Sequence, residues 1–146
     1  MNDPTTQLVL LLHAGSTLAM FGLIWFVQIV HYPLMNAVGA DGYTRYQHRH
    51  MSRTTWVVAP LMLMELTTAV LLLSLLGAAF YAFTIPGLVL IALLWISTAA
   101  LQVPAHKVLT SGFAPDAHRR LVATNWARTV LWSARSVIAC VLIATA

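Results

Sequence analysis

The chain has few charged residues for its length. Of its 146 residues, 8 are Lys or Arg and 4 are Asp or Glu, so 8% are charged, whereas soluble domains have roughly 25%. Hydrophobic residues make up 60% of the sequence. This balance excludes a soluble globular domain and indicates an integral membrane protein.

Cysteine is nearly absent as well. Cys140 is the only one, which excludes an intramolecular disulfide and any metal site built from several thiolates. The net charge of +4 comes from scattered residues, and no basic patch of the size that nucleic acid requires is present. Nucleic acid is therefore excluded as a partner.

Four long apolar runs are present, at about residues 8–30, 56–76, 87–103 and 121–143. Each is near the roughly 20 residues that a helix needs to cross a bilayer, and lipid offers no water to satisfy the backbone of any open structure. The sequence predicts an all-α fold, a four-helix transmembrane bundle in a single integral membrane domain, 1–146. The expected location is the cell membrane, as a multi-pass protein of the bacterial inner membrane, with the lipid bilayer as its first partner.

Basic residues lie in two of the three connections. They are Arg45, Arg49 and Arg53 before the second run, and Lys107, Arg119 and Arg120 before the fourth. The N-terminal segment and the connection at 77–86 contain no Lys or Arg. The positive-inside rule then predicts that both basic connections are cytoplasmic and that both termini lie on the non-cytoplasmic side.

Four residues in or near the connections predict helix boundaries and bends. Asp41 is suited to cap a short helix that leads into the second run, and Pro115 to begin a helix that continues into the fourth. Pro86 is expected to open the third helix, and Pro60 to bend the second.

Three charged residues interrupt the apolar runs: Glu65, Arg128 and Arg135. A charge at the bilayer centre costs about 2.5–3.5 kcal/mol, so it normally faces the bundle interior and finds a partner. At 1.5 Å per residue, Glu65 lies at a depth between the two arginines, so either could reach it, and a shared Arg–Glu–Arg arrangement is one alternative. Either the pair only fastens two helices together, or one arginine is left to hold an anion. These three are the candidate catalytic residues.

The arginines share one face of the fourth run with other polar and aromatic side chains. Asn125, Arg128, Thr129, Trp132 and Arg135 are spaced i, i+3, i+4, i+7 and i+10, which is one face of an α-helix. The candidate ligand-binding residues are Asn125, Trp126, Thr129 and Trp132, together with Gln102 of the third run.

Five histidines are expected near the cytoplasmic ends of the helices: His31, His48, His50, His106 and His118. Imidazole is the commonest metal ligand, so these five are candidates for binding a metal ion or haem. The alternative is that they are interfacial side chains with their polar tips among the headgroups. The sequence does not decide between these alternatives, so whether a metal ion or haem is bound stays unknown.

Three segments carry a family resemblance. HYPL at 31–34, RTTWVVAP at 53–60 and ATNWART at 123–129 resemble a family of small, uncharacterised four-helix bacterial integral membrane proteins, over nearly the whole length. The resemblance implies the architecture and no function. His13, Trp25 and Pro60 give a fainter, architectural likeness to the four-helix membrane protoporphyrinogen oxidases of bacteria, from which the chain departs because its third run has no lysine matching that family's functional one.

Three functions remain open from the sequence. The first is a membrane-embedded enzyme or cofactor binder that acts on a hydrophobic ligand with an anionic head, such as a quinone-, porphyrin- or acyl-like molecule. The second is a non-catalytic accessory or assembly subunit of a larger membrane complex. The third is a small transporter that works as a homo-oligomer.

Overall fold

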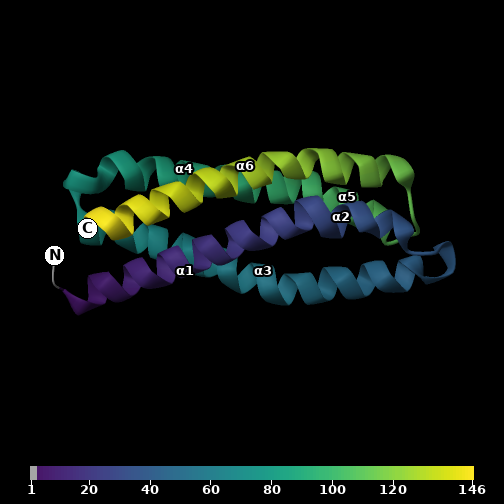
Figure 1. The fold of residues 1–146 in the computed structure, drawn as a ribbon, viewed down its shortest axis with the longest axis horizontal. Coiled ribbons are helices and arrows are strands. Elements are labelled where there is room, and N and C mark those ends of the chain that lie inside the picture. Colours follow the sequence, from purple (N-terminus) through teal and green to yellow (C-terminus); the bar gives the residue numbers. More distant parts are fainter. Residues whose placement is uncertain (1–2) are drawn as a thin grey trace.

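The computed structural model describes residues 3–146, and every regular element in that range is helical, with no strand. Four long helical rods lie side by side, with both termini at one end of the bundle (Figure 1). Each rod is long and apolar enough to cross a membrane, consistent with a multi-pass membrane protein. The elements in order are α1 (Pro4–Phe26), η1 (Val27–His31), α2 (Tyr32–Leu34), η2 (Met35–Ala37), α3 (Ala40–Leu76), η3 (Ala78–Phe80), α4 (Tyr81–Ser97), η4 (Thr98–Gln102), α5 (Val103–Leu109) and α6 (Pro115–Thr145).

The rods are longer than the four apolar runs. They cover Pro4–Ala37, Ala40–Leu76, Ala78–Leu109 and Pro115–Thr145, between 31 and 37 residues each. The extra turns lie mostly toward the end opposite the termini, where Arg45, Arg49, Arg53, Lys107, Arg119 and Arg120 are located. We call this the basic end. Its helices extend past the apolar part, as amphipathic turns do when they leave the hydrocarbon for the headgroups.

Two predicted helix boundaries are wrong. Asp41 does not cap a separate short helix: α3 is continuous, its N-cap is Gly39, and Asp41 lies in the first turn without a capping hydrogen bond. Pro86 does not open the third rod, because α4 begins at Tyr81 and includes it. Pro86 is the sixth residue of α4 and lies past its first turn, so it removes one backbone hydrogen bond to the carbonyl of Ala82, which the helix tolerates. The predicted start of α6 at Pro115 is confirmed.

The first and third rods each contain one π-helical turn. η1 is closed by the Tyr32 N–H bonding to the Val27 carbonyl, and η4 by the Val103 N–H bonding to the Thr98 carbonyl. A proline follows each turn, at Pro33 and Pro104. A proline lacks an N–H and its ring displaces the carbonyl four residues earlier, so the helix widens just before it. The wide turns bring Gln28 and Gln102 to the buried side of their rods.

The apolar core forms three clusters along the bundle. Val9, Leu72 and Leu142 belong to the cluster nearest the termini, Met20, Leu94 and Trp132 to the middle one, and Tyr43, Leu109 and Leu121 to the one at the basic end. Large apolar side chains also cover the outside, as expected of helices made for contact with lipid. Between the clusters the interior is polar, and these polar layers contain the charged residues.

Candidate functional site

The buried acid and one of the arginines form an ion pair. Arg135 donates from Nε to Glu65 Oε1 at 3.1 Å, its Nη2 lies 3.1 Å from the same oxygen, and both side chains are 1% exposed. Thr17 adds a second hydrogen bond to the same oxygen at 2.8 Å. The predicted contact between Glu65 and an arginine is therefore confirmed for Arg135.

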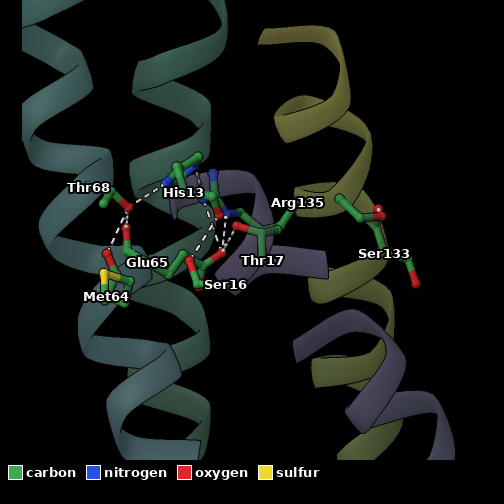
Figure 2. A network of polar contacts seen from close by, with 9 residues as sticks. His13, Ser16, Thr17, Met64, Glu65, Thr68, Ser133 and Arg135 are labelled. Atoms are coloured by element: carbon green, nitrogen blue, oxygen red, sulfur yellow. Dashed lines mark hydrogen bonds and ion pairs between the residues drawn. The ribbon is translucent and has the colours of Figure 1, made fainter. Parts of the chain in front are cut away.

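His13 completes this network. Its Nδ1 lies 2.8 Å from Thr68 Oγ1, and its Nε2 lies 2.9 Å from Arg135 Nη2 (Figure 2). The Thr68 hydroxyl has one proton, which it directs to the Met64 carbonyl at 2.7 Å, so its oxygen accepts from His13 Nδ1–H. His13 Nε2 then accepts from Arg135. The hydrogen bonds therefore assign a neutral His13 with its proton on Nδ1.

A glycine is the contribution of α4 to this network. A Cβ added at Gly87 would lie 2.5 Å from Arg135 Nη1, so the guanidinium lies directly against the α4 backbone. The adjoining cavity, beside Thr84, has a volume of about 10 Å³, about enough for one water molecule. All four rods therefore meet at a closed, well-paired charge, which we call the Glu65–Arg135 network.

Arg128 has a different environment. It lies seven positions before Arg135 on α6, about 10 Å along the helix axis at 1.5 Å per residue. Arg128 is buried and donates from Nη1 to Asn125 Oδ1 at 3.2 Å, and its Nε has no partner. The shared Arg–Glu–Arg arrangement is therefore absent from the described residues 3–146.

None of the four acids of the sequence neutralises Arg128. Glu65 pairs with Arg135, and Asp116 pairs with Arg119 on the surface. Asp3 caps α1 by accepting from the Thr5 and Thr6 amides, and the Thr6 bonds lower the pKa of its carboxyl. Asp41 is exposed at the start of α3 and forms no ion pair within residues 3–146. Among the described residues 3–146, Arg128 is thus a buried cation without an anion.

A chain of amides holds Arg128 in place. Asn125 accepts from Arg128 and donates from Nδ2 to Gln28 Oε1 at 2.9 Å, and Gln28 in turn donates to the Val122 carbonyl at 3.3 Å. Thr129 donates to the Asn125 carbonyl at 3.1 Å and is fully buried. Since Gln28 lies in η1, the wide turn supports the orientation of the arginine on the opposite rod.

Arg128 lines a cavity of about 250 Å³ in the interior near the basic end. Most of its wall is apolar, and the polar side chains form a smaller part. The apolar members are Leu23, Ile24, Val27, Met51, Val58, Ala59, Met62, Trp95 and Val103; the polar members are Tyr32, His50, Thr54, Thr55, Thr98, Gln102, His106 and Arg128. We call this space the Arg128 cavity.

The mouth of the Arg128 cavity lies between two rods. The exposed side chains among its walls include Thr55 of α3, Trp95 of α4 and Val103 of α5, with Trp95 37% and Val103 51% exposed. Trp95 lies within the apolar part of the third rod, Val103 at the end of that part, and Thr55 beside Trp56 toward the basic end. The cavity therefore opens sideways, in the direction that lipid would occupy.

Three of the five predicted histidines come together beside this cavity. His31 Nε2 lies 2.9 Å from His50 Nδ1, and the rings of His50 and His106 are 5.3 Å apart. His106 bonds through Nε2 to the Tyr32 hydroxyl and through Nδ1 to Gln47 Nε2, both at 2.9 Å. Both ring nitrogens of His106 are therefore engaged by the protein.

The other two histidines lie elsewhere. His48 is exposed on α3, and the Nε2 of His118 is hydrogen-bonded to the Tyr32 carbonyl at 2.7 Å. Within residues 3–146, no group of three or more His, Cys, Asp or Glu side chains is placed to hold a metal ion. The five histidines are thus not gathered into one centre.

The predicted ligand-binding residues are also divided. Gln102 lines the Arg128 cavity. Asn125 accepts a hydrogen bond from Arg128, and Thr129 donates to the Asn125 carbonyl, so neither lines the cavity itself. Trp132 is buried in the middle apolar cluster with its Nε1 unpartnered. Trp126 lies on the outside, where its ring packs edge-on against Trp25 at 5.9 Å. It does not reach the cavity.

Two features of the site are not apparent from the sequence pattern. Tyr32 is 4% exposed and contacts His106, although nothing in the spacing of residues sets it apart. The wide turns are the second feature, and the prolines at 33 and 104 are the available signal for them, because each lies close to a polar residue at the end of an apolar run.

Comparisons of the chain with protein families, with curated proteins and with solved structures find no match. The function therefore has to be inferred from the geometry of the buried charges and the cavity beside them.

We expect Glu65→Gln to destabilise the protein strongly. It would leave Arg135 buried without a counter-charge, which costs about 3–5 kcal/mol for a fully buried pair. The measurement is unfolding in detergent micelles, followed by tryptophan fluorescence. Glu65→Met combined with Arg135→Met should recover most of the loss, since it removes both charges at similar volume. A single variant as stable as wild type would refute the importance of the pair.

Gly87→Ala should be destabilising although alanine favours helix. Replacing a glycine inside a helix by alanine stabilises the folded protein by about 0.5–1 kcal/mol. Forcing Arg135 away from the new methyl group costs about 1–3 kcal/mol, which is more. Gly22→Ala is the matched control, because nothing lies within 4 Å of its added Cβ. The same unfolding assay should rank Gly87→Ala below the control. Equal stabilities would show that the guanidinium moves aside freely.

Proposed function

We propose that this protein is a membrane-embedded binding protein, an enzyme or cofactor binder, for a hydrophobic ligand whose polar head carries negative charge. The observation that carries the proposal is Arg128, a buried guanidinium without a carboxylate partner on the wall of a mostly apolar cavity. A buried charge left unpaired is costly, and in apolar surroundings such residues mark functional sites. The ligand's head supplies the missing anion.

The size of the cavity narrows the ligand. A cavity of about 150 Å³ holds a benzene ring, so about 250 Å³ holds one substituted ring or a carboxyl-type head. It is smaller than the roughly 300–1,000 Å³ of pockets that enclose a whole drug-sized ligand. A quinone-like or acyl-like head fits this space better than the four pyrroles of a porphyrin. The remainder of the molecule extends through the mouth between α3 and α4.

The route of entry supports a hydrophobic ligand. The mouth is on the flank that would face lipid, and Trp95 and Val103 border it. A molecule dissolved in the bilayer reaches this mouth without crossing water. A water-soluble substrate would have to leave water and cross the acyl layer first, so the position of the mouth favours a lipid-soluble one.

The groups around Arg128 would also permit chemistry on the head. Tyr32 and His106 are hydrogen-bonded to each other at 2.9 Å, and both line the cavity. Tyrosine and histidine are able to give and take a proton, while arginine stabilises a developing negative charge. Glu65, the acid among the candidate catalytic residues, is held in the Glu65–Arg135 network, so the proton-transfer role falls to Tyr32 and His106.

For the orientation we propose the basic end in the cytoplasm and both termini outside, in the inner membrane of a bacterium. Six Lys and Arg residues lie at the basic end, and none in the uncharged turn around η3. The positive-inside rule carries this proposal. The Arg128 cavity then lies in the cytoplasmic half of the bilayer.

The accessory-subunit alternative makes a different use of Arg128. There, a carboxylate of a partner subunit or of a second copy would enter between α3 and α4 and neutralise it. The alternatives differ in what accompanies the purified protein, which is a small molecule in one case and another protein in the other. No residue arrangement in the described chain favours the transporter alternative over these two.

The two buried arginines should respond oppositely to the same substitution. Arg135→Gln should destabilise the protein by about 3–5 kcal/mol, because Glu65 loses its partner. Arg128→Gln should leave the ligand-free protein as stable as wild type or more so, because it removes a charge without a counter-charge. The pair is matched in residue type, helix and burial, and unfolding in micelles measures both. Equal destabilisation would make Arg128 a structural residue.

Arg128→Gln should also lose the ligand. Protein extracted gently from bacterial membranes would be denatured, and the released small molecules identified by mass spectrometry. We expect at least tenfold less ligand than in wild type, which corresponds to a change of about 1.4 kcal/mol in the free energy of binding. Arg128→Lys should retain part of the ligand, because lysine keeps the charge but lacks the planar guanidinium. Arg119→Gln, exposed on the same helix, is the control. Co-purification of a protein in place of a small molecule would favour the accessory subunit.

The orientation is testable by cysteine labelling. In a Cys140→Ser background, single cysteines would be placed at Thr5, in the turn at Tyr81 and at Arg49. A membrane-impermeant maleimide applied to intact cells should label the first two and leave the third unlabelled until the cells are lysed. Labelling at position 49 alone would invert the proposed orientation.

A further inference from the structure

A second cavity lies on the outside of α3 at the basic end. It has a volume of about 430 Å³ and is lined by His31, Gly42, Arg45, Tyr46, Arg49, His50, Arg53 and Thr54. The arginines are spaced i, i+4 and i+8, so they share one face of α3 over about 12 Å at 1.5 Å per residue. We call this cavity the arginine groove.

The three arginines of the groove lack protein partners. All three are exposed, and within residues 3–146 the ion pairs are Glu65–Arg135 and Asp116–Arg119, neither of which involves them. The groove therefore concentrates three positive charges with two histidines, and its lining residues include no carboxylate; Asp41, one turn before Arg45, forms no ion pair with them within residues 3–146. The planar fork of arginine matches the oxygens of a phosphate in two parallel hydrogen bonds.

The position of the groove along α3 places it at headgroup depth. Trp56, one turn after Arg53, is 79% exposed, and exposed tryptophan is typical of the membrane–water interface. Beyond it, α3 continues into the apolar span. The arginines thus begin where the hydrocarbon ends, which is where the phosphates of a phospholipid lie.

An apolar strip continues the same face of α3 away from the groove. Val57 follows Arg53 by four residues, and the same face continues at three- and four-residue steps through Pro60, Met64, the exposed Thr67 and Leu71. Val57, Met64 and Leu71 are all exposed large apolar residues. One face of a single helix therefore offers charge for a phosphate and, directly next to it, a track for acyl chains.

We infer that the arginine groove and this strip together bind an anionic phospholipid, with its phosphate between Arg45, Arg49 and Arg53 and its chains along Val57, Met64 and Leu71. The site is separate from the one proposed for the Arg128 ligand. Free phosphate shares the headgroup chemistry, but it would make no use of the strip. The alternative of a general surface charge, without a site, would make the six basic residues of this end interchangeable.

The test compares two triple variants in lipid nanodiscs made of phosphatidylcholine with one-fifth phosphatidylglycerol. The groove variant is Arg45→Gln, Arg49→Gln and Arg53→Gln. The control is Lys107→Gln, Arg119→Gln and Arg120→Gln, which removes the same charge from the other basic connection. Native mass spectrometry counts the phosphatidylglycerol molecules that stay bound on release.

We expect the groove variant to retain at least tenfold less phosphatidylglycerol than wild type, and the control to retain the wild-type amount. An equal loss in both variants, or no loss in either, would overturn the inference. Inorganic phosphate added at millimolar concentration to nanodiscs of phosphatidylcholine alone tests the other source. If it binds in a groove-dependent manner, the site is for a soluble anion and the lipid assignment fails.

Two further variants keep the outcome interpretable. If the triple variant unfolds, Arg49→Gln is compared with Lys107→Gln in the same assay, and the same ordering is expected. Val57→Asn keeps the arginines and interrupts the strip, so it should lower phosphatidylglycerol binding. In an Arg128→Gln background, the groove variant should lose phosphatidylglycerol by the same factor relative to its parent, so the test does not depend on a ligand in the Arg128 cavity.

Discussion

The architecture depends on one buried ion pair that lies out of reach of water, inside four helices long and apolar enough to cross a membrane. Glu65 and Arg135 are both 1% exposed, and each rod supplies something to the pair: Thr17 and His13 from α1, Thr68 from α3, Gly87 from α4 and the guanidinium from α6. In lipid, helices gain little from burying apolar side chains, because the surrounding acyl chains are equally apolar. A polar contact that only one arrangement satisfies therefore selects the register of the four rods.

The two buried arginines differ in their surroundings, and the difference suits Arg135 to a structural role and Arg128 to the proposed binding role. Arg135 directs donors to Glu65 and His13 and lies against the α4 backbone, so its surroundings leave no room for a ligand. Arg128, two turns away, has an amide partner and faces a cavity. The protein supports Arg128 through Asn125 and Gln28 and yet supplies no counter-charge. Arg128 is therefore held in place but keeps an unpartnered Nε and no counter-charge, which is the observation behind the proposed binding site.

Composition and spacing predicted the fold because lipid restricts the choices. Four apolar runs in a chain with 8% charge leave few alternatives to four helices, and the depth argument brought Glu65 within reach of an arginine. Depth alone could not decide between Arg128 and Arg135, since the side-chain directions depend on how α6 is rotated. In the structure Arg135 lies against the backbone at Gly87, and the wide turns at Val27–His31 and Thr98–Gln102 change the phase of the two rods that face α6; none of this is readable from depth. The continuous α3 was likewise hidden, because its first turns are polar and resemble a loop by composition.

His50 and Thr54 line both the Arg128 cavity and the arginine groove, so the wall between these spaces is one layer of side chains. His50 is hydrogen-bonded through Nδ1 to His31 at 2.9 Å and lies 3.2 Å from Thr54 Oγ1, and a change in its ring orientation alters both spaces at once. If both proposed ligands bind, a ligand that shifts this ring in one space also changes the affinity of the other space, and the change is equal in both directions. Lipids at the surface of α3 would then alter binding in the interior without entering it.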